Sequence, residues 1–295
     1  MTDSRFEQWD VVSSVGLTAL VVAAGRSVDT HRPDGLISDP YAEAFVQAAN
    51  PAQPLATRPV EPKDDSDDEL WQMMSGYMGT RTRFFDEYFA GATGRGLRQV
   101  VVLASGLDTR AHRLDWPAGT SFYEVDQAKM IEFKDAVLEQ EGATARCDRR
   151  TVLADLRDDW PAALRAAGFD PATPTAWLTE GLLPYLPAET QSALVDAIDD
   201  LSAPGSEWAI EDFTNIAQQF DDPAFGRVAA KMGVDMQQLL YSDERPDPAA
   251  TLRSRGWTTD THVAVEVAKS YGRTLDPLTQ RLNGQSSFVT ATKAR

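Results

Sequence analysis

From Gln99 onwards, short runs of β-branched and aromatic residues alternate with helical stretches, and this alternation constrains the fold more than any other feature. Five runs have the length of buried strands: QVVVLA (99–104), SFYEVD (121–126), RTVLAD (150–155), TAWLTE (175–180) and SEWAIED (206–212). The sequence between them predicts helices over 127–141, 160–167 and 188–201. Strands that alternate with helices are typical of a parallel sheet covered by crossover helices. The sequence therefore predicts an α/β fold.

The segments on either side of this core have a different pattern. Apolar residues at helical spacing predict three helices before the core, over 11–28, 41–49 and 69–90. After the core we expect a helical segment over 214–240, a strand over 261–267 and a closing strand within GQSSFVTATKA (284–294). We therefore divide the chain into an N-terminal helical segment (1–95), a cofactor-binding core (96–212), a cover or substrate insertion (213–280) and a closing strand (281–295).

The charge of the chain excludes several function classes. The net charge of −17 disfavours contact with nucleic acid or an anionic membrane, because both carry negative charge. The first ten residues are polar and acidic, and no apolar run approaches the roughly 20 residues that span a bilayer. A cytoplasmic location is expected. The acidic cluster DDSDDE (64–69) lacks the glycine and the spacing of a calcium loop, so no metal site is predicted.

The candidate ligand site lies where the predicted strands end. Gly106, Asp126, Asp155 and Glu180 follow or end successive strands. In an open α/β sheet, ligands bind beyond the carboxyl ends of the strands. Each residue also has a structural alternative, which is a tight turn for Gly106 and a helix cap for Asp126 or Asp155. The ordered series along one edge, with Asp126 placed to accept ribose hydroxyls, predicts a nucleoside ligand.

The turn after the first strand helps to choose the nucleoside. A dinucleotide site requires GxGxxG, and the turn ASGLDTR (104–110) has one of those glycines and an acidic Asp108 where phosphates would sit. S-adenosylmethionine has no phosphate and carries cationic groups, which Asp108 or Glu180 can face. Arg81 lies in the middle of the apolar stripe of the predicted 69–90 helix. It can bind the cofactor carboxylate, or it can form a structural ion pair or extend to solvent.

These motifs resemble a known family. VVVLASGLDTRAHRLDWPAGTSFYEVDQAKMIEFK (100–134) is similar to the leucine carboxyl methyltransferase-like proteins of actinobacteria, which are numerous in mycobacteria. Further similar segments are SSVGLTAL (13–20), DPYAEAF (39–45), GYMGTRTRFFDEYF (76–89), ADLR (154–157) and TEGLLPYL (179–186). The resemblance implies a Rossmann-like class I methyltransferase fold, with a mostly parallel seven-stranded sheet, N-terminal helices and a helical cover insertion. It also implies S-adenosylmethionine as cofactor, held by Arg81, Gly106, Asp126, Asp155, Leu156 and Glu180.

The expected chemistry is O-methylation of a carboxylate on a small molecule. A carboxylate is ionised at neutral pH and needs no strong base, in keeping with three scattered histidines, none of them at a predicted strand end. Tyr185 follows the fourth strand and can orient an acceptor. Two alternatives remain open, an NAD(P)-dependent oxidoreductase and a nucleoside-binding module without turnover. The sequence does not identify the acceptor, the catalytic residues or the oligomeric state.

Overall fold

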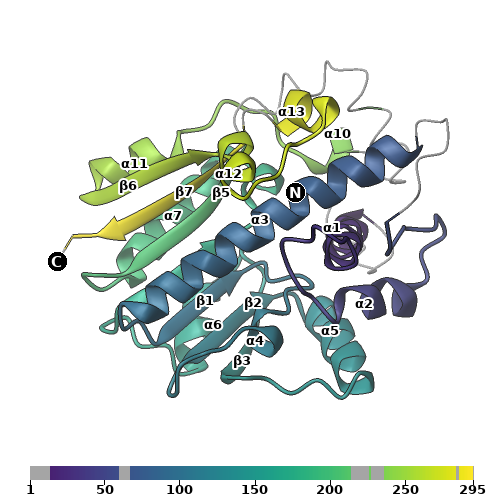
Figure 1. Ribbon diagram of the computed structural model, residues 1–295. Coiled ribbons are helices and arrows are strands. Elements are labelled where there is room, and N and C mark those ends of the chain that lie inside the picture. Colours follow the sequence, from purple (N-terminus) through teal and green to yellow (C-terminus); the bar gives the residue numbers. More distant parts are fainter. Residues whose placement is uncertain (1–13, 60–66, 214–225, 227–235, 284–285, 295) are drawn as a thin grey trace.

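The computed structural model describes residues 14–59, 67–213, 226, 236–283 and 286–294 (Figure 1). Its described strands form one seven-stranded sheet in the order β3-β2-β1-β4-β5-β7-β6. The strands are β1 (Gln99–Leu103), β2 (Ser121–Asp126), β3 (Asp148–Leu153), β4 (Thr175–Thr179), β5 (Glu207–Phe213), β6 (Trp257–Val263) and β7 (Ser286–Lys293). The first five pair in parallel, and β7 runs antiparallel between β5 and β6. The predicted α/β class is confirmed.

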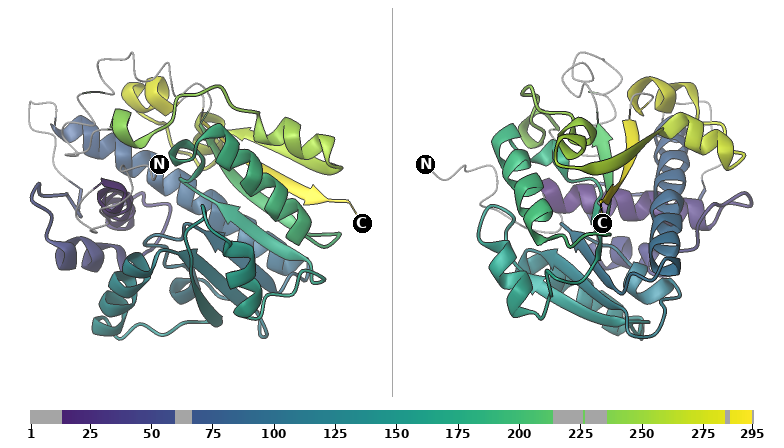
Figure 2. Two further views of the ribbon diagram at one scale, coloured as in Figure 1. Left: turned by 180° about the vertical axis from the view of Figure 1, so that it is seen from behind. Right: turned by 90° about the vertical axis from the view of Figure 1, so that its left-hand side faces the viewer.

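Helices cover both faces of the sheet (Figure 2). The helices before β5 are α1 (Ser14–Thr30), α2 (Ala42–Ala49), α3 (Asp67–Gly94), α4 (Arg110–Arg113), α5 (Ala128–Gln140), α6 (Trp160–Ala166) and α7 (Ala188–Leu201). The later ones are α10 (Met236–Leu239), α11 (Pro248–Ser254), α12 (Ala264–Ser270) and α13 (Pro277–Asn283). The long helix α3 crosses one face, and α6 and α7 lie against the other.

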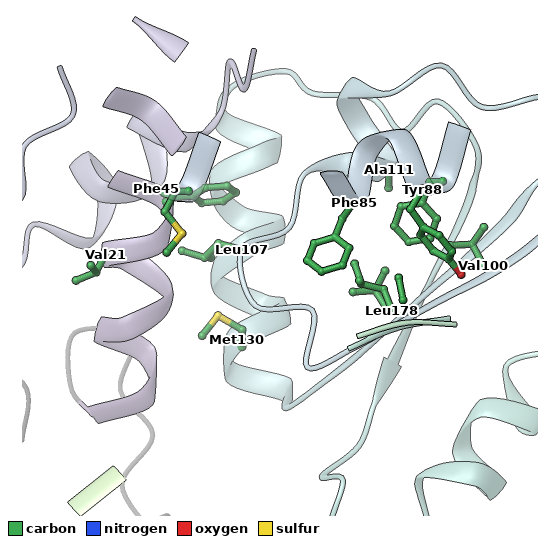
Figure 3. Packing of buried hydrophobic residues seen from close by; sticks show 14 of the residues in the cluster. Val21, Phe45, Phe85, Tyr88, Val100, Leu107, Ala111, Met130 and Leu178 are labelled. Atoms are coloured by element: carbon green, nitrogen blue, oxygen red, sulfur yellow. The ribbon is translucent and has the colours of Figure 1, made fainter. Parts of the chain in front are cut away.

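The alternation of side chains along β1 divides the core in two. Val100 and Val102 join the cluster under α1, α3 and α5, whereas Val101 and Leu103 join the cluster under α6 and α7. Figure 3 shows the first cluster, in which Phe85 of α3 lies near Leu178 of β4. Because both faces are buried, β1 is apolar at four successive positions, which is typical of a central parallel strand.

Two strand predictions were displaced. The sixth strand was expected over 261–267, but β6 covers Trp257–Val263 and residues 264–270 form α12. In β6 only Trp257 is buried, so this edge strand has little hydrophobic signal, and Ala264, Val267 and Ala268 are buried at helical spacing. Strand β3 begins and ends two residues earlier than the predicted RTVLAD. It is also an edge strand with a single buried residue, so its apolar pattern defines its ends poorly.

The described part of the chain contains no helix long and apolar enough to cross a membrane. Most of the helical segment expected over 214–240 lies outside the described residues. Within this segment the structure describes residues 226 and 236–240, and α10 is formed by Met236–Leu239. The acidic cluster DDSDDE (64–69) also lies partly outside the described residues. Its last three residues are the first three of α3.

Candidate cofactor site

The site begins at the turn that follows β1. Ala104 and Gly106 both have a positive φ, of 50° and 48°, so the chain turns sharply at the sheet edge. A Cβ added at Gly106 would lie 3.8 Å from its nearest neighbour, the Cβ of Ala19. The left-handed backbone, rather than lack of space, therefore favours glycine here. Helix α1 lies over this turn, since Arg26 donates a 2.7 Å hydrogen bond to the carbonyl of Leu107.

Asp126, the last residue of β2, faces the same turn. Its Oδ2 accepts the backbone N–H of Gly106 at 2.6 Å and its Oδ1 accepts that of Gln127 at 2.7 Å. Burial raises the pKa of the Asp126 carboxyl, and the two backbone donors oppose this effect. The side chain does not cap α5, whose cap residue Gln127 has no side-chain cap bond. Each carboxylate oxygen retains a lone pair for a further donor.

Asp155 lies beside Asp126 but not at a strand end, because β3 stops at Leu153. Its Oδ2 accepts a 3.0 Å hydrogen bond from the side chain of Gln127, which links the ends of β2 and β3. Its Oδ1 accepts the backbone N–H of Arg157 at 2.9 Å, and hydrogen bonding to Arg157 lowers the pKa of Asp155. The next residue, Leu156, is partly buried and packs on the hydrophobic cluster under α6 and α7.

Arg81 on α3 occupies the other end of the site. It is only 6% exposed, and its Nε lies 2.7 Å from Oε1 of Glu180 and 3.1 Å from Oε2 of Glu211. The Nε–H is aligned for a hydrogen bond with neither carboxylate. Of the terminal nitrogens, Nη1 contacts the sulfur of Met78 at 3.5 Å, and Nη2 would lie 2.9 Å from a Cβ on Gly181. Nε therefore lies between two carboxylates, and the terminal nitrogens lie over a glycine.

Glu211 and Tyr77 belong to this group, and the sequence did not point to Glu211. Glu211 is fully buried on β5 and accepts the Tyr77 hydroxyl and the Gly181 N–H, each at 2.7 Å. Burial raises the pKa of the Glu211 carboxyl, and the nearby Arg81 opposes this effect. Glu207 and Glu211 alternate with Trp208 and Ile210, a pattern typical of a strand with one polar face. This alternation does not reveal that α3 covers the polar face of β5, so the sequence alone did not place Glu211 in the site.

The run GLDTRAHR (106–113) stabilises the turn through its arginines. Arg110 is 3% exposed and pairs with Asp86 at 2.7 Å, with Glu180 at 2.7 Å and with Asp108. Asp108 also accepts the Arg110 backbone N–H at 2.6 Å. Arg110 lowers the pKa of Asp108 to about 2, against the effect of burial. Asp108 is thus engaged inside the protein, and Glu180 is shared between Arg81 and Arg110.

His112 and Tyr185 were also considered from the sequence, and of these two Tyr185 lies close enough for the charges of Arg81 and Glu211 to act on its hydroxyl. His112 is buried against Tyr41, with ring centroids 6.2 Å apart, and burial lowers its pKa. Tyr185 lies in the short helix η2 (Leu183–Tyr185) and bonds with Thr18 of α1. The structure therefore brings Gly106 and Asp126 into direct contact, with Asp155 one side chain away. It brings Arg81 and Glu180 into direct contact at the end of β4.

Comparisons with known proteins identify the family of the chain. A family model described as leucine carboxyl methyltransferase matches residues 19–199. A proposed S-adenosyl-L-methionine-dependent methyltransferase of Rhodococcus jostii is 49% identical, over 97% of this chain and 98% of its own length. A protein of Saccharopolyspora erythraea with the same assignment is 46% identical, over 98% and 99%.

Two solved structures share the fold. A proposed methyltransferase from Thermobifida fusca has a TM-score of 0.55 at 17% identity, covering 97% of this chain and 96% of its own. A DUF574 family protein from Streptomyces avermitilis has a TM-score of 0.51 at 16% identity, covering 79% and 94%. The family model spans more than half of the chain, and the relatives span nearly all of it. This protein belongs to the leucine carboxyl methyltransferase family.

Proposed function

We propose that this protein transfers a methyl group from S-adenosylmethionine to a carboxylate of a small molecule. Membership of the family makes the chain a methyltransferase that uses S-adenosylmethionine. The choice of a carboxylate acceptor rests on the family description and on the chemistry of the site, and it goes beyond the activity itself.

The edge of the sheet has donors and acceptors that fit the cofactor. Asp126 offers two carboxylate oxygens to ribose hydroxyls, beside a turn whose backbone permits close approach. Asp155 and Leu156 lie one strand further along, where an adenine would extend. Arg81 offers its terminal nitrogens to the amino-acid carboxylate, and Glu180 offers negative charge to the ammonium. We assign these residues, together with Gly106, to cofactor binding.

One observation carries the assignment. The Arg81 guanidinium is buried at the ligand edge, and its Nε lies 2.7 Å from Glu180 and 3.1 Å from Glu211, but among the described residues neither carboxylate hydrogen-bonds to its terminal nitrogens. An arginine that served only as a structural ion pair would be expected to use its terminal nitrogens in a bidentate pair, as Arg95 does with Glu207 through Nε and Nη2 at 2.6 and 2.5 Å. This arrangement supports the proposal that the terminal nitrogens of Arg81 bind an external carboxylate.

The chain's own residues supply binding and orientation rather than proton transfer. When bound, S-adenosylmethionine supplies an electrophilic methyl group on its sulfonium. An ionised carboxylate is already nucleophilic, so positioning and exclusion of water suffice. We assign to Tyr185, in the short helix η2 after β4, the orientation of the acceptor, and α1 covers the turn that follows β1.

Neither alternative gains support from a specific contact. For a dinucleotide, the pyrophosphate would sit at the start of the helix after β1, where Asp108 already accepts the Arg110 N–H at 2.6 Å. A binding module without turnover would occupy the same edge, and an assay separates it from an enzyme.

The test uses the purified protein, S-adenosylmethionine with a radiolabelled methyl group, and pools of small carboxylic acids. Methyl esters are hydrolysed by mild alkali and release volatile methanol, whereas ethers and methylamines do not. The proposal predicts label in acceptors that becomes volatile after alkali. Label that resists alkali would contradict the carboxylate acceptor, and cofactor binding without any transfer would favour the binding module.

A further inference from the structure

Two Arg–Glu pairs lie at opposite ends of β5. Arg95, the residue after α3, pairs with Glu207 where β5 begins, and Arg81 of α3 approaches Glu211 near the carboxyl end, at the ligand edge. Glu207 and Glu211 lie on the same face of β5, since they are four residues apart. The two pairs therefore provide a buried ion pair near the site and a more exposed one, on the same strand, away from it.

Glu211 has more partners than a simple ion pair requires. Its Oε1 accepts the Tyr77 hydroxyl, and its Oε2 both accepts the Gly181 N–H and lies 3.1 Å from Arg81 Nε. Tyr77 and Arg81 are one helical turn apart on α3, and Gly181 is the second residue after β4. One fully buried carboxylate thus fixes a helix and a loop relative to each other.

We infer that Glu211 is a positioning residue, which sets the Arg81 guanidinium over Gly181 so that its terminal nitrogens meet the carboxylate of the cofactor. This inference rests on the proposed role of Arg81 as the site for that carboxylate. Glu180 divides its two oxygens between Arg81 and Arg110, each at 2.7 Å, whereas Glu211 pairs with Arg81 alone among the described arginines and lysines. A Cβ on residue 181 would occupy the space that Arg81 Nη2 uses.

The test compares two ligands that share the adenosine moiety. S-adenosylhomocysteine carries the amino-acid tail, and 5′-methylthioadenosine lacks it. Calorimetry gives the ratio of their affinities for the full-length protein, for Glu211→Gln and for Glu207→Gln. The wild type is expected to favour S-adenosylhomocysteine by roughly tenfold or more, the value of a charge-assisted pair. Glu211→Gln is expected to lose about tenfold in affinity for S-adenosylhomocysteine and to keep affinity for 5′-methylthioadenosine within about twofold.

The control Glu207→Gln is expected to leave the ratio unchanged, because its arginine is remote from the ligand edge. Equal losses for both ligands in Glu211→Gln, or no loss, would overturn the inference. If Glu211→Gln does not fold, Tyr77→Phe replaces it, since it removes only the hydroxyl that Glu211 binds. A lower ratio in Tyr77→Phe supports the inference and an unchanged ratio overturns it.

The two proposals fail in different ways. A wild-type ratio near one would show that no residue recognises the tail, and the proposed role of Arg81 would fail. A high wild-type ratio that Arg81→Lys abolishes and Glu211→Gln preserves would leave the role of Arg81 intact and remove that of Glu211.

Discussion

The backbone N–H of Gly106 donates a 2.6 Å hydrogen bond to Oδ2 of Asp126, and this bond joins the ends of two neighbouring strands. It fixes the Asp126 carboxylate beside a left-handed turn at the ligand edge of the sheet. The carboxylate is therefore oriented before any ligand arrives, which reduces the entropy lost on binding.

Asp126→Asn is expected to weaken binding of every adenosine ligand. The amide keeps the shape of the side chain, but its NH₂ group must face one of the two backbone donors, from Gly106 or Gln127. We expect a loss of about tenfold or more for both S-adenosylhomocysteine and 5′-methylthioadenosine, measured by calorimetry. Asp148→Asn, at an exposed carboxylate where β3 begins, serves as control. A loss confined to S-adenosylhomocysteine would contradict the ribose assignment.

Gly181→Ala and Gly168→Ala are expected to differ in ligand binding, although alanine introduces backbone strain at both positions. Both glycines have a positive φ, of 64° and 97°, so alanine is expected to cost about 1 kcal/mol of stability at each. At Gly181 the new Cβ contacts the buried Arg81, whereas at Gly168 it contacts the half-exposed Arg150, which can move into solvent. Binding of S-adenosylhomocysteine should fall only in Gly181→Ala. Equal binding by the two variants would show that Arg81 is not constrained there.

Acid should remove the stabilising contribution of Asp108. Its pKa is lowered from 3.8 to about 2 in the folded protein, because Arg110 stabilises the ionised form. Ionised Asp108 therefore contributes about 2 kcal/mol above pH 4, and this contribution disappears as the pH falls towards 2. In urea unfolding from pH 7 to pH 3, the gap between wild type and Asp108→Asn should stay constant down to about pH 4 and then narrow. A gap that narrowed instead between pH 7 and pH 5 would be inconsistent with the lowered pKa.

Cys147, the single cysteine of the chain, is expected to react slowly in the folded protein. Burial raises the pKa of its thiol to about 12, so little thiolate is present at pH 8. Mass spectrometry after iodoacetamide treatment should show slow modification in buffer and rapid modification in urea. Rapid modification of the folded protein would contradict the burial of this side chain.

The sequence predicted the parallel core because its central strands are buried on both faces and carry a strong apolar signal. β1, β2, β4 and β5 lie where they were expected, to within two residues. The edge strands β3 and β6 were displaced, since an edge strand is half exposed and its apolar pattern is weak. The ends of a strand were thus predicted best where the strand is most deeply buried.

The candidate site was predictable in part, for a different reason. Strand ends meet at one edge, so Gly106, Asp126 and Glu180 could be placed from the strand pattern alone. Glu211 could not be placed, because its role depends on α3 crossing the polar face of β5, which is a long-range contact. The role of Arg110 likewise could not be predicted, because it depends on ion pairs with Asp86 and Glu180, which are 24 and 70 residues away in the sequence.

A crystal structure of the protein with S-adenosylhomocysteine will show whether adenosine lies along the Asp126 edge with its amino-acid tail on Arg81. We expect the ribose hydroxyls within hydrogen-bond distance of Asp126 and the tail carboxylate on the terminal nitrogens of Arg81. If the bound ligand instead leaves Arg81 paired only with Glu180 and Glu211 and its tail lies elsewhere, the proposed cofactor site is wrong.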